Sequence, residues 1–205
     1  MTIHEPATLV TDYLLAALSA WLGSRLRYGT SAPQRWWSLA LWLSGAAAAV
    51  GGTFHGFGPG LPPAGAQALW RITLLFISLT SAAMGLTLVG ALASVQRRVL
   101  FAWMVWAKFA AFSTALLVWP VFLVAVTDYG TTMLALAVAA HICAPPWRAA
   151  MLAGVGLSAL AAIVQQMHWG TSSRLNHNDL YHVIQAAAAF LFFRAGKNLG
   201  RQAPE

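Results

Sequence analysis

The chain has 205 residues, of which 59% are hydrophobic and only 8% are charged. This composition excludes a water-soluble domain, because so much apolar side-chain surface requires a lipid bilayer as its solvent. The net charge of +7 does not indicate nucleic-acid binding, since the basic residues lie between apolar stretches and no soluble basic domain is present to form a groove. The single cysteine excludes an intramolecular disulfide and a thiolate metal site.

Seven apolar stretches are long enough to be transmembrane helices, which need about 20 residues each. We therefore predict an all-α integral membrane protein, a seven-transmembrane-helix bundle that forms a single membrane domain over residues 1–205. Runs rich in small residues at 44–52 and 153–156 predict that helices approach closely there. The predicted spans lie at about 7–26, 36–56, 66–92, 99–118, 121–142, 148–168 and 178–198.

The basic residues predict the orientation of the bundle. The intervening gaps contain only Arg71 and Arg174, and Lys108 lies within the fourth span. The positive-inside rule then places the N-terminus outside and the C-terminus in the cytoplasm, and the basic composition with one cysteine favours a bacterial inner membrane. The nine residues in or beside every second gap are Arg25, Arg27, Arg35, Arg97, Arg98, Arg148, Arg194, Lys197 and Arg201.

One tetrapeptide occurs twice in the chain. Residues 10–13 and residues 126–129 both read Val-Thr-Asp-Tyr, near the start of the first and fifth predicted spans. Spans one to three and five to seven have the same predicted orientation, so a parallel three-plus-one-plus-three repeat with the fourth span as linker fits the pattern. Coincidence on a low-complexity apolar background is the alternative explanation.

Ionisable residues gather at one depth of the predicted bundle. Such residues are costly inside a bilayer, so they usually face the bundle interior and indicate function. Lys108, the only basic residue well inside a predicted span, can pair with Asp12 or Asp128 in a purely structural role. The residues predicted in the outer half of the membrane are Asp12, His55, Asp128, His168, His177, Asp179 and His182.

The densest polar motif is residues 176–182, where the seventh span begins. Asp179 and His182 are three residues apart, so a helix places both on one face, and His55 reaches a matching depth from the end of the second span. Neutral imidazoles and a carboxylate are suitable zinc ligands, and a catalytic zinc keeps one position open for water. We predict His55, Asp179 and His182 as zinc ligands, with His177 as a fourth ligand or proton shuttle.

Structural roles explain several of these residues as well. Asn178 or Asp179 is a good N-cap for the seventh span, and histidines at a membrane interface are often only hydrogen-bonded. His182 lies deeper in the helix, where a functional role is favoured. Asp12 and Asp128 lie a turn or more inside their spans, where buried hydrogen bonding to a tyrosine is the structural alternative.

The chain resembles the CREST superfamily in four features. It has seven spans and an N-terminus on the same face as the site. His55 ends the second span, and a histidine motif begins the seventh. This superfamily includes alkaline ceramidases and the progestin and adipoQ receptors, and the resemblance implies a zinc-dependent membrane hydrolase. Gly51 stands four positions before His55, as a small residue does in that family. The family's two span-seven histidines correspond here to Asn178 and His182, and its aspartate at the start of span three has no counterpart. The Asn-His-Asn start of the seventh span is also similar to small uncharacterised bacterial membrane proteins.

Three functions remain open at this point. The first is a zinc-dependent hydrolase of a lipid amide or ester, with Asp12 or Asp128 as general base and His177 in proton transfer. The second is a small-molecule or proton-coupled transporter that uses Asp12 and Asp128 as protonation sites. The third is a non-catalytic membrane sensor or assembly protein. In each case membrane lipids are the expected partners, with a lipid substrate in the first.

Overall fold

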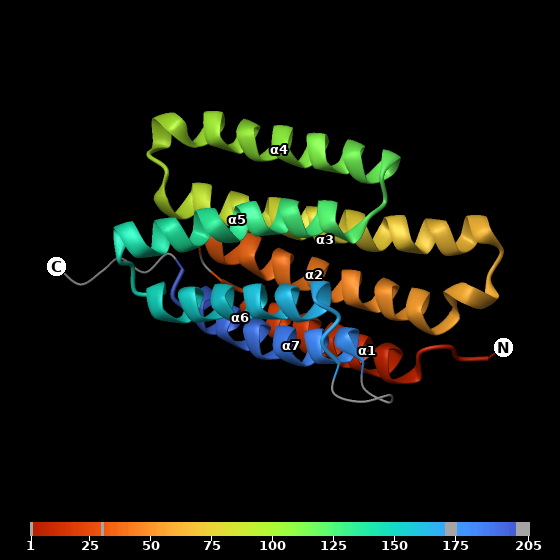
Figure 1. The fold of residues 1–205 in the computed structure, drawn as a ribbon. Coiled ribbons are helices and arrows are strands. Elements are labelled where there is room, and N and C mark those ends of the chain that lie inside the picture. The colour runs from red at the N-terminus through yellow and green to blue at the C-terminus, as the bar shows by residue number, and fades with distance from the viewer. Residues whose placement is uncertain (1, 30, 171–175, 200–205) are drawn as a thin grey trace.

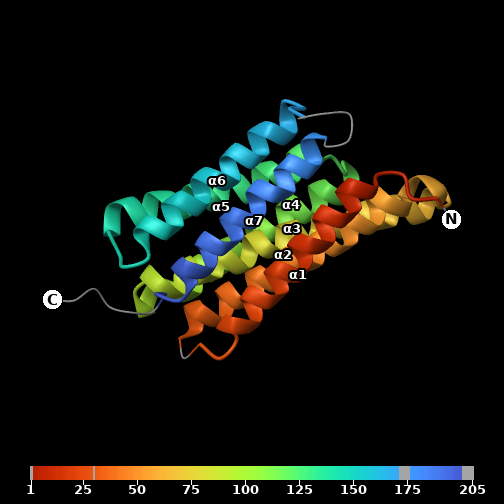
Figure 2. The same cartoon turned by 90° about the horizontal axis from the view of Figure 1, so that it is seen from below.

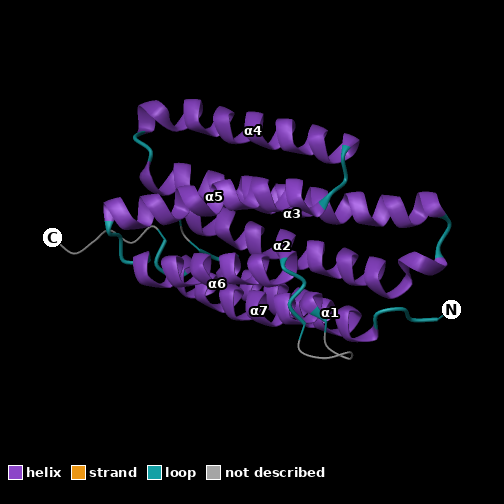
Figure 3. Ribbon diagram, in the orientation of Figure 1, coloured by secondary structure: helices purple, strands orange, loops and turns teal. Residues whose placement is uncertain are grey.

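The computed structural model describes residues 2–29, 31–170 and 176–199, and every regular element in those ranges is a helix (Figure 1, Figure 3). This finding confirms the all-helical prediction. Arg174 and Arg201, which contributed to the predicted orientation, lie outside the described residues. The elements are α1 (Pro6–Leu26), α2 (Ala32–Phe57), the 3-10 helix η1 (Gly58–Gly60), α3 (Pro63–Leu92), α4 (Val95–Val118), α5 (Phe122–Cys143), α6 (Arg148–Gln166) and α7 (His177–Gly196).

Within the described part of the chain, five helices are long and apolar enough to cross a membrane: α2 continued by η1, α3, α4, α5 and α6. These helices indicate a membrane protein. The other two, α1 and α7, have 21 and 20 residues, but their polar side chains make them less hydrophobic. Three of those side chains, Asp12, Asp179 and His182, are buried within the bundle. Membrane crossing by α1 and α7 therefore stays a prediction.

Consecutive helices run antiparallel, so the loops gather at two opposite ends of the bundle (Figure 1, Figure 2). The helix α1 packs along α2 and α7, α2 packs along α3, and α6 packs along α7. Among the described helices, α4 touches only α3 and α5 and lies at the periphery (Figure 1). This arrangement brings the first turns of α1 and α7 to the same end of the bundle as the last turns of α2 and α6.

Glycines allow the closest helix contacts, as the runs of small residues predict. A Cβ atom at Gly52 of α2 would lie 2.7 Å from the Cβ of Asp12, and one at Gly154 of α6 would lie 2.6 Å from the Phe192 ring. A larger side chain at either position requires a neighbour to shift, Asp12 of α1 in the first case and the Phe192 ring in the second. Gly52 therefore lets α1 bring Asp12 against α2, and Gly154 lets α6 pack on α7.

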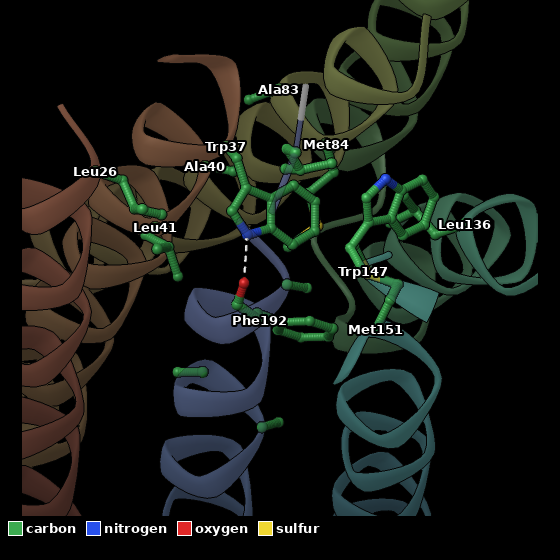
Figure 4. Close-up of a cluster of buried hydrophobic side chains, with 14 of the residues drawn as sticks. Leu26, Trp37, Ala40, Leu41, Ala83, Met84, Leu136, Trp147, Met151 and Phe192 are labelled. Atoms are coloured by element: carbon green, nitrogen blue, oxygen red, sulfur yellow. Dashed lines mark hydrogen bonds between the residues drawn. The ribbon is translucent and has the colours of Figure 1, made fainter. Parts of the chain in front are cut away.

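The end of the bundle opposite the first turn of α1 is closed by packed apolar side chains (Figure 4). Trp37 and Phe192 meet edge to face with ring centroids 5.7 Å apart, and Trp37 Nε1 donates a hydrogen bond to the Phe192 carbonyl oxygen at 2.8 Å. Trp147, Leu136 and Met84 pack in the same cluster. This apolar core joins α1, α2, α3, α5, α6 and α7, and the ionisable residues of the cavity lie towards the other end.

Candidate functional site

A cavity of about 480 Å³ lies between α2, α3, α5, α6 and α7, and two residues of α1 complete its wall. Three of the predicted zinc or proton-transfer residues, His55, His177 and His182, line the cavity together with Asp12. Asp128 is not among the lining residues. The rest of the wall is mostly apolar with scattered hydroxyl and amide side chains, so the histidines and the aspartate are concentrated towards one end.

The cavity is elongated along α7, with one polar and one apolar end. Its lining residues on α7 run from His177 to Phe192, which at the α-helical rise of ~1.5 Å per residue is about 22 Å. The polar end lies beside His177 and His55. The apolar end lies beside Leu41 and Phe192, next to the apolar core. A molecule with one polar group and one hydrocarbon chain matches this distribution.

The exposed lining residues indicate that the cavity reaches the surface of the bundle between α5 and α6. Gly130 and Leu134 of α5 and Ala159 of α6 line it and are also exposed, with 64% of Leu134 accessible. A Cβ atom added at Gly130 would meet no other atom within 4 Å. The two helices therefore leave a lateral opening, on a face that would contact lipid in a membrane.

The helices α1 and α7 meet at a buried aspartate and histidine. Asp12 Oδ1 lies 3.1 Å from His182 Nε2, and Thr11 Oγ1 lies 3.1 Å from His182 Nδ1. Only 3% of Asp12 and 7% of His182 are exposed. Both ring nitrogens of His182 thus have partners on α1, whereas Asp12 Oδ2 has none among the described residues.

Asp179 holds the start of α7. Asn176 is the N-cap, with extended backbone, and its side chain accepts from the backbone N–H groups of Asn178 and Asp179. Asp179 in turn accepts from the Asn176 N–H at 2.7 Å and from the Thr8 hydroxyl at 2.8 Å. The prediction that Asn178 or Asp179 is the N-cap is therefore wrong, because the N-cap is Asn176 and Asp179 is the N3 residue of its capping box.

The other histidines of this end have protein partners too. His55 Nδ1 lies 3.3 Å from Glu5 Oε2, and Glu5 also accepts from Asn176 Nδ2 at 3.4 Å. The rings of His177 and His168 lie 4.6 Å apart. Partial burial lowers the pKa of His177, and the neighbouring His168 lowers it further.

A second buried aspartate lies between α3, α4 and α5. Asp128 Oδ1 forms an ion pair with Lys108, which confirms that Lys108 pairs with one of the two aspartates. The hydroxyl groups of Ser78 and Ser81 donate to the same carboxylate. Both of its oxygens therefore have partners, and 1% of the residue is exposed. Asp12 and Asp128 belong to different parts of the bundle, and only Asp12 lines the cavity.

The described side chains do not fit a zinc ion held by three protein ligands. Within residues 2–29, 31–170 and 176–199, no group of three or more histidine, cysteine, aspartate or glutamate side chains could hold a metal. Among the predicted ligands, Asp179 is bound in the helix cap, His182 is bound by α1, and His55 pairs with Glu5. Zinc stays a prediction that this geometry does not support.

The sequence analysis did not identify several polar residues that lie in or beside the cavity wall. Thr8 and Thr11 bind the polar residues of α7, and Gln185 accepts from Ser158 Oγ at 3.0 Å inside the cavity wall. Helical spacing was the available signal. Thr8 precedes Asp12 by four residues and Gln185 follows His182 by three, so each pair shares a helix face.

The whole bundle, with the cavity and both buried aspartates, falls within one matched region. A family model described as "Family of unknown function (DUF6962)" matches residues 7–201. The chain belongs to this family. No curated protein and no solved structure matches the chain. The family supplies no activity, so the resemblance to the CREST superfamily stays a prediction.

Proposed function

We propose that the protein binds a membrane amphiphile with a single hydrocarbon chain in the cavity. The chain would lie along α7, and the polar group would lie beside Asp12 and His55. The observation that carries this proposal is the cavity itself, with a polar end, an apolar end and an opening between α5 and α6. A cavity of about 480 Å³ has the size of a small-molecule site, and such sites combine an apolar wall with a few polar groups.

The lateral opening supports entry from the bilayer. An amphiphile that enters between α5 and α6 keeps its hydrocarbon chain out of water throughout, so entry carries no cost of exposing apolar surface. The exposed lining residues Gly130, Leu134 and Ala159 stand where the chain would pass. A water-soluble ligand would gain nothing from an opening on this face.

The proposed location is a bacterial inner membrane, with the polar end of the cavity in the outer half. The support comes from the loops at the opposite end, which join α1 to α2, α3 to α4 and α5 to α6. These loops and the adjoining helix ends carry Arg25, Arg27, Arg35, Arg97, Arg98 and Arg148, as cytoplasmic loops do.

Gly130→Phe tests the proposal, because the ring would enter the lateral opening. We expect binding of a fluorescent single-chain amphiphile to fall about tenfold, since the ring would occupy space that the bound chain fills and so remove several favourable contacts. Gly156→Phe is the matched control, because Gly156 also has no atom within 4 Å of an added Cβ but does not line the cavity. Equal binding by both variants and the unaltered protein would overturn the proposal.

The predicted hydrolase and transporter both begin with this binding step. Hydrolysis of a lipid amide or ester needs an activated water, and the predicted zinc ligands are engaged elsewhere. A carrier that uses both aspartates would have to release Asp128 from Lys108. We therefore place binding first and propose acyl-chain release and proteoliposome flux as the assays that separate an enzyme, a carrier and a non-catalytic sensor.

A further inference from the structure

The polar end of the cavity contains a carboxylate oxygen without a partner. Asp12 lines the cavity, and its Oδ2 atom makes no hydrogen bond with any described residue. Gly51, which also lines the cavity, is placed so that an added Cβ would lie 3.9 Å from both carboxylate oxygens. Gly51 therefore keeps the side chains of α2 away from the carboxylate, and an added methyl group there would contact both of its oxygens.

Oδ2 is a hydrogen-bond acceptor in both arrangements in which Asp12 and His182 share one proton between Oδ1 and Nε2. If His182 carries a proton on Nε2, it donates that proton to Asp12 Oδ1 at 3.1 Å. If the carboxyl group carries the proton instead, the same contact requires it on Oδ1, directed at Nε2. In both arrangements Oδ2 holds no hydrogen, and a buried acceptor of this kind is normally paired.

The described lining of the cavity provides no permanently charged cation to fill this position. Among the described residues that line the cavity there is no lysine or arginine. The nearby acidic residues Glu5 and Asp179 are engaged with Asn176, and the Thr11 hydroxyl bonds to His182 and its own helix. A partner for Oδ2 therefore has to be a water molecule or a ligand in the cavity.

We propose that the amphiphile carries an N–H or O–H donor on its polar group and gives this hydrogen to Asp12 Oδ2. This inference rests on the proposed binding function and specifies the chemistry of the ligand. A long-chain alcohol and a long-chain protonated amine both satisfy it. A long-chain ether or quaternary ammonium, which lacks a donor, does not.

Four probes with the same dodecyl chain test the requirement: dodecylamine, 1-dodecanol, dodecyl methyl ether and dodecyltrimethylammonium. Occupancy would be measured by native mass spectrometry on the full chain, released from micelles that contain each probe at one mole fraction. We expect the alcohol or the amine to bind about tenfold better than the ether, as a hydrogen bond to a charged or polar buried group gives. If only the amine does so, the donor is cationic; if trimethylammonium binds equally well, charge and not a donor is recognised, and the proposal is overturned.

Two variants connect the preference to Asp12. Asp12→Asn replaces Oδ2 or Oδ1 by an amide nitrogen, and Gly51→Ala places a methyl group 3.9 Å from both oxygens. Each should bring the ratio of alcohol to ether binding close to one while ether binding persists. Gly65→Ala is the matched control, because its added Cβ meets only Leu61, at 3.8 Å.

The outcomes separate this inference from the proposed function. If no probe binds the unaltered protein, the proposed function fails. If all four bind it equally, or if both variants keep the preference of the unaltered protein, only the donor requirement fails. Circular dichroism and thermal unfolding of each variant confirm that a lost preference comes from a folded protein.

Discussion

The two copies of Val-Thr-Asp-Tyr place their aspartates in opposite situations. Asp128 is fully paired, with Lys108 on one oxygen and Ser78 on the other, and it does not line the cavity. Asp12 has His182 on one oxygen and no partner on the other, and it lines the cavity. The same four-residue sequence thus places Asp128 in the structural core and makes Asp12 a candidate binding group. The neighbouring helices make this difference, since α4 provides a lysine and α7 provides a histidine.

Replacing Lys108 should lower the free energy of unfolding more than any other substitution considered. Lys108→Met leaves the Asp128 carboxylate buried without its counter-ion, which costs about 3 kcal/mol or more in the free energy of unfolding. The measurement is thermal or denaturant unfolding in detergent. The double variant Lys108→Met/Asp128→Asn should recover most of the loss, because it removes the unpaired charge. A loss below about 1 kcal/mol in the single variant would show that Asp128 does not depend on this pair.

Asparagine at the two aspartate positions should separate the structural carboxylate from the binding carboxylate. Asp128→Asn loses hydrogen bonds to a charged group and should cost about 2 kcal/mol of unfolding free energy. Asp12→Asn keeps an acceptor for His182 and loses no lysine or arginine partner, so its cost should stay below about 1 kcal/mol. Parallel unfolding experiments measure both. Equal losses of unfolding free energy would mean that Asp12 and Asp128 contribute equally to the stability of the fold.

The Asp12 and His182 region should bind no more zinc than the Asp128 and Lys108 region. Both ring nitrogens of His182 have partners on α1, so we expect protein purified without a histidine tag to contain far less than stoichiometric zinc by mass spectrometry. His182→Ala should leave that level unchanged. Stoichiometric zinc that disappears in His182→Ala would instead establish the predicted metal site, and Asp12 would then act beside a metal.

Part of the candidate site could be predicted from the sequence, because polar residues inside apolar helices are conspicuous. Asp12, His55, His177 and His182 were predicted in the outer half of the membrane, and all four line one cavity. The hydrogen-bonding roles of these and neighbouring residues were harder to predict from the sequence. A capping box depends on where the chain turns into the helix, so Asp179 was assigned to zinc although Asn176 and Thr8 hold it. No pattern in the sequence predicts the opening between α5 and α6.

The sequence by itself determined the all-helical architecture with one helix for each of seven apolar stretches, since proline and glycine interrupt those stretches and lipid leaves the backbone few alternatives to helix. It also predicted close helix packing at the runs of small residues 44–52 and 153–156, which holds at Gly52 and Gly154 but not at Gly156. Only the tertiary structure decided that His182 faces Asp12, that Lys108 faces Asp128, and that a cavity with an unpaired carboxylate oxygen lies between the helices. The physical reason is that a helix with apolar residues on all sides carries little periodic signal. Packing against several neighbours at once therefore selects which polar residues meet.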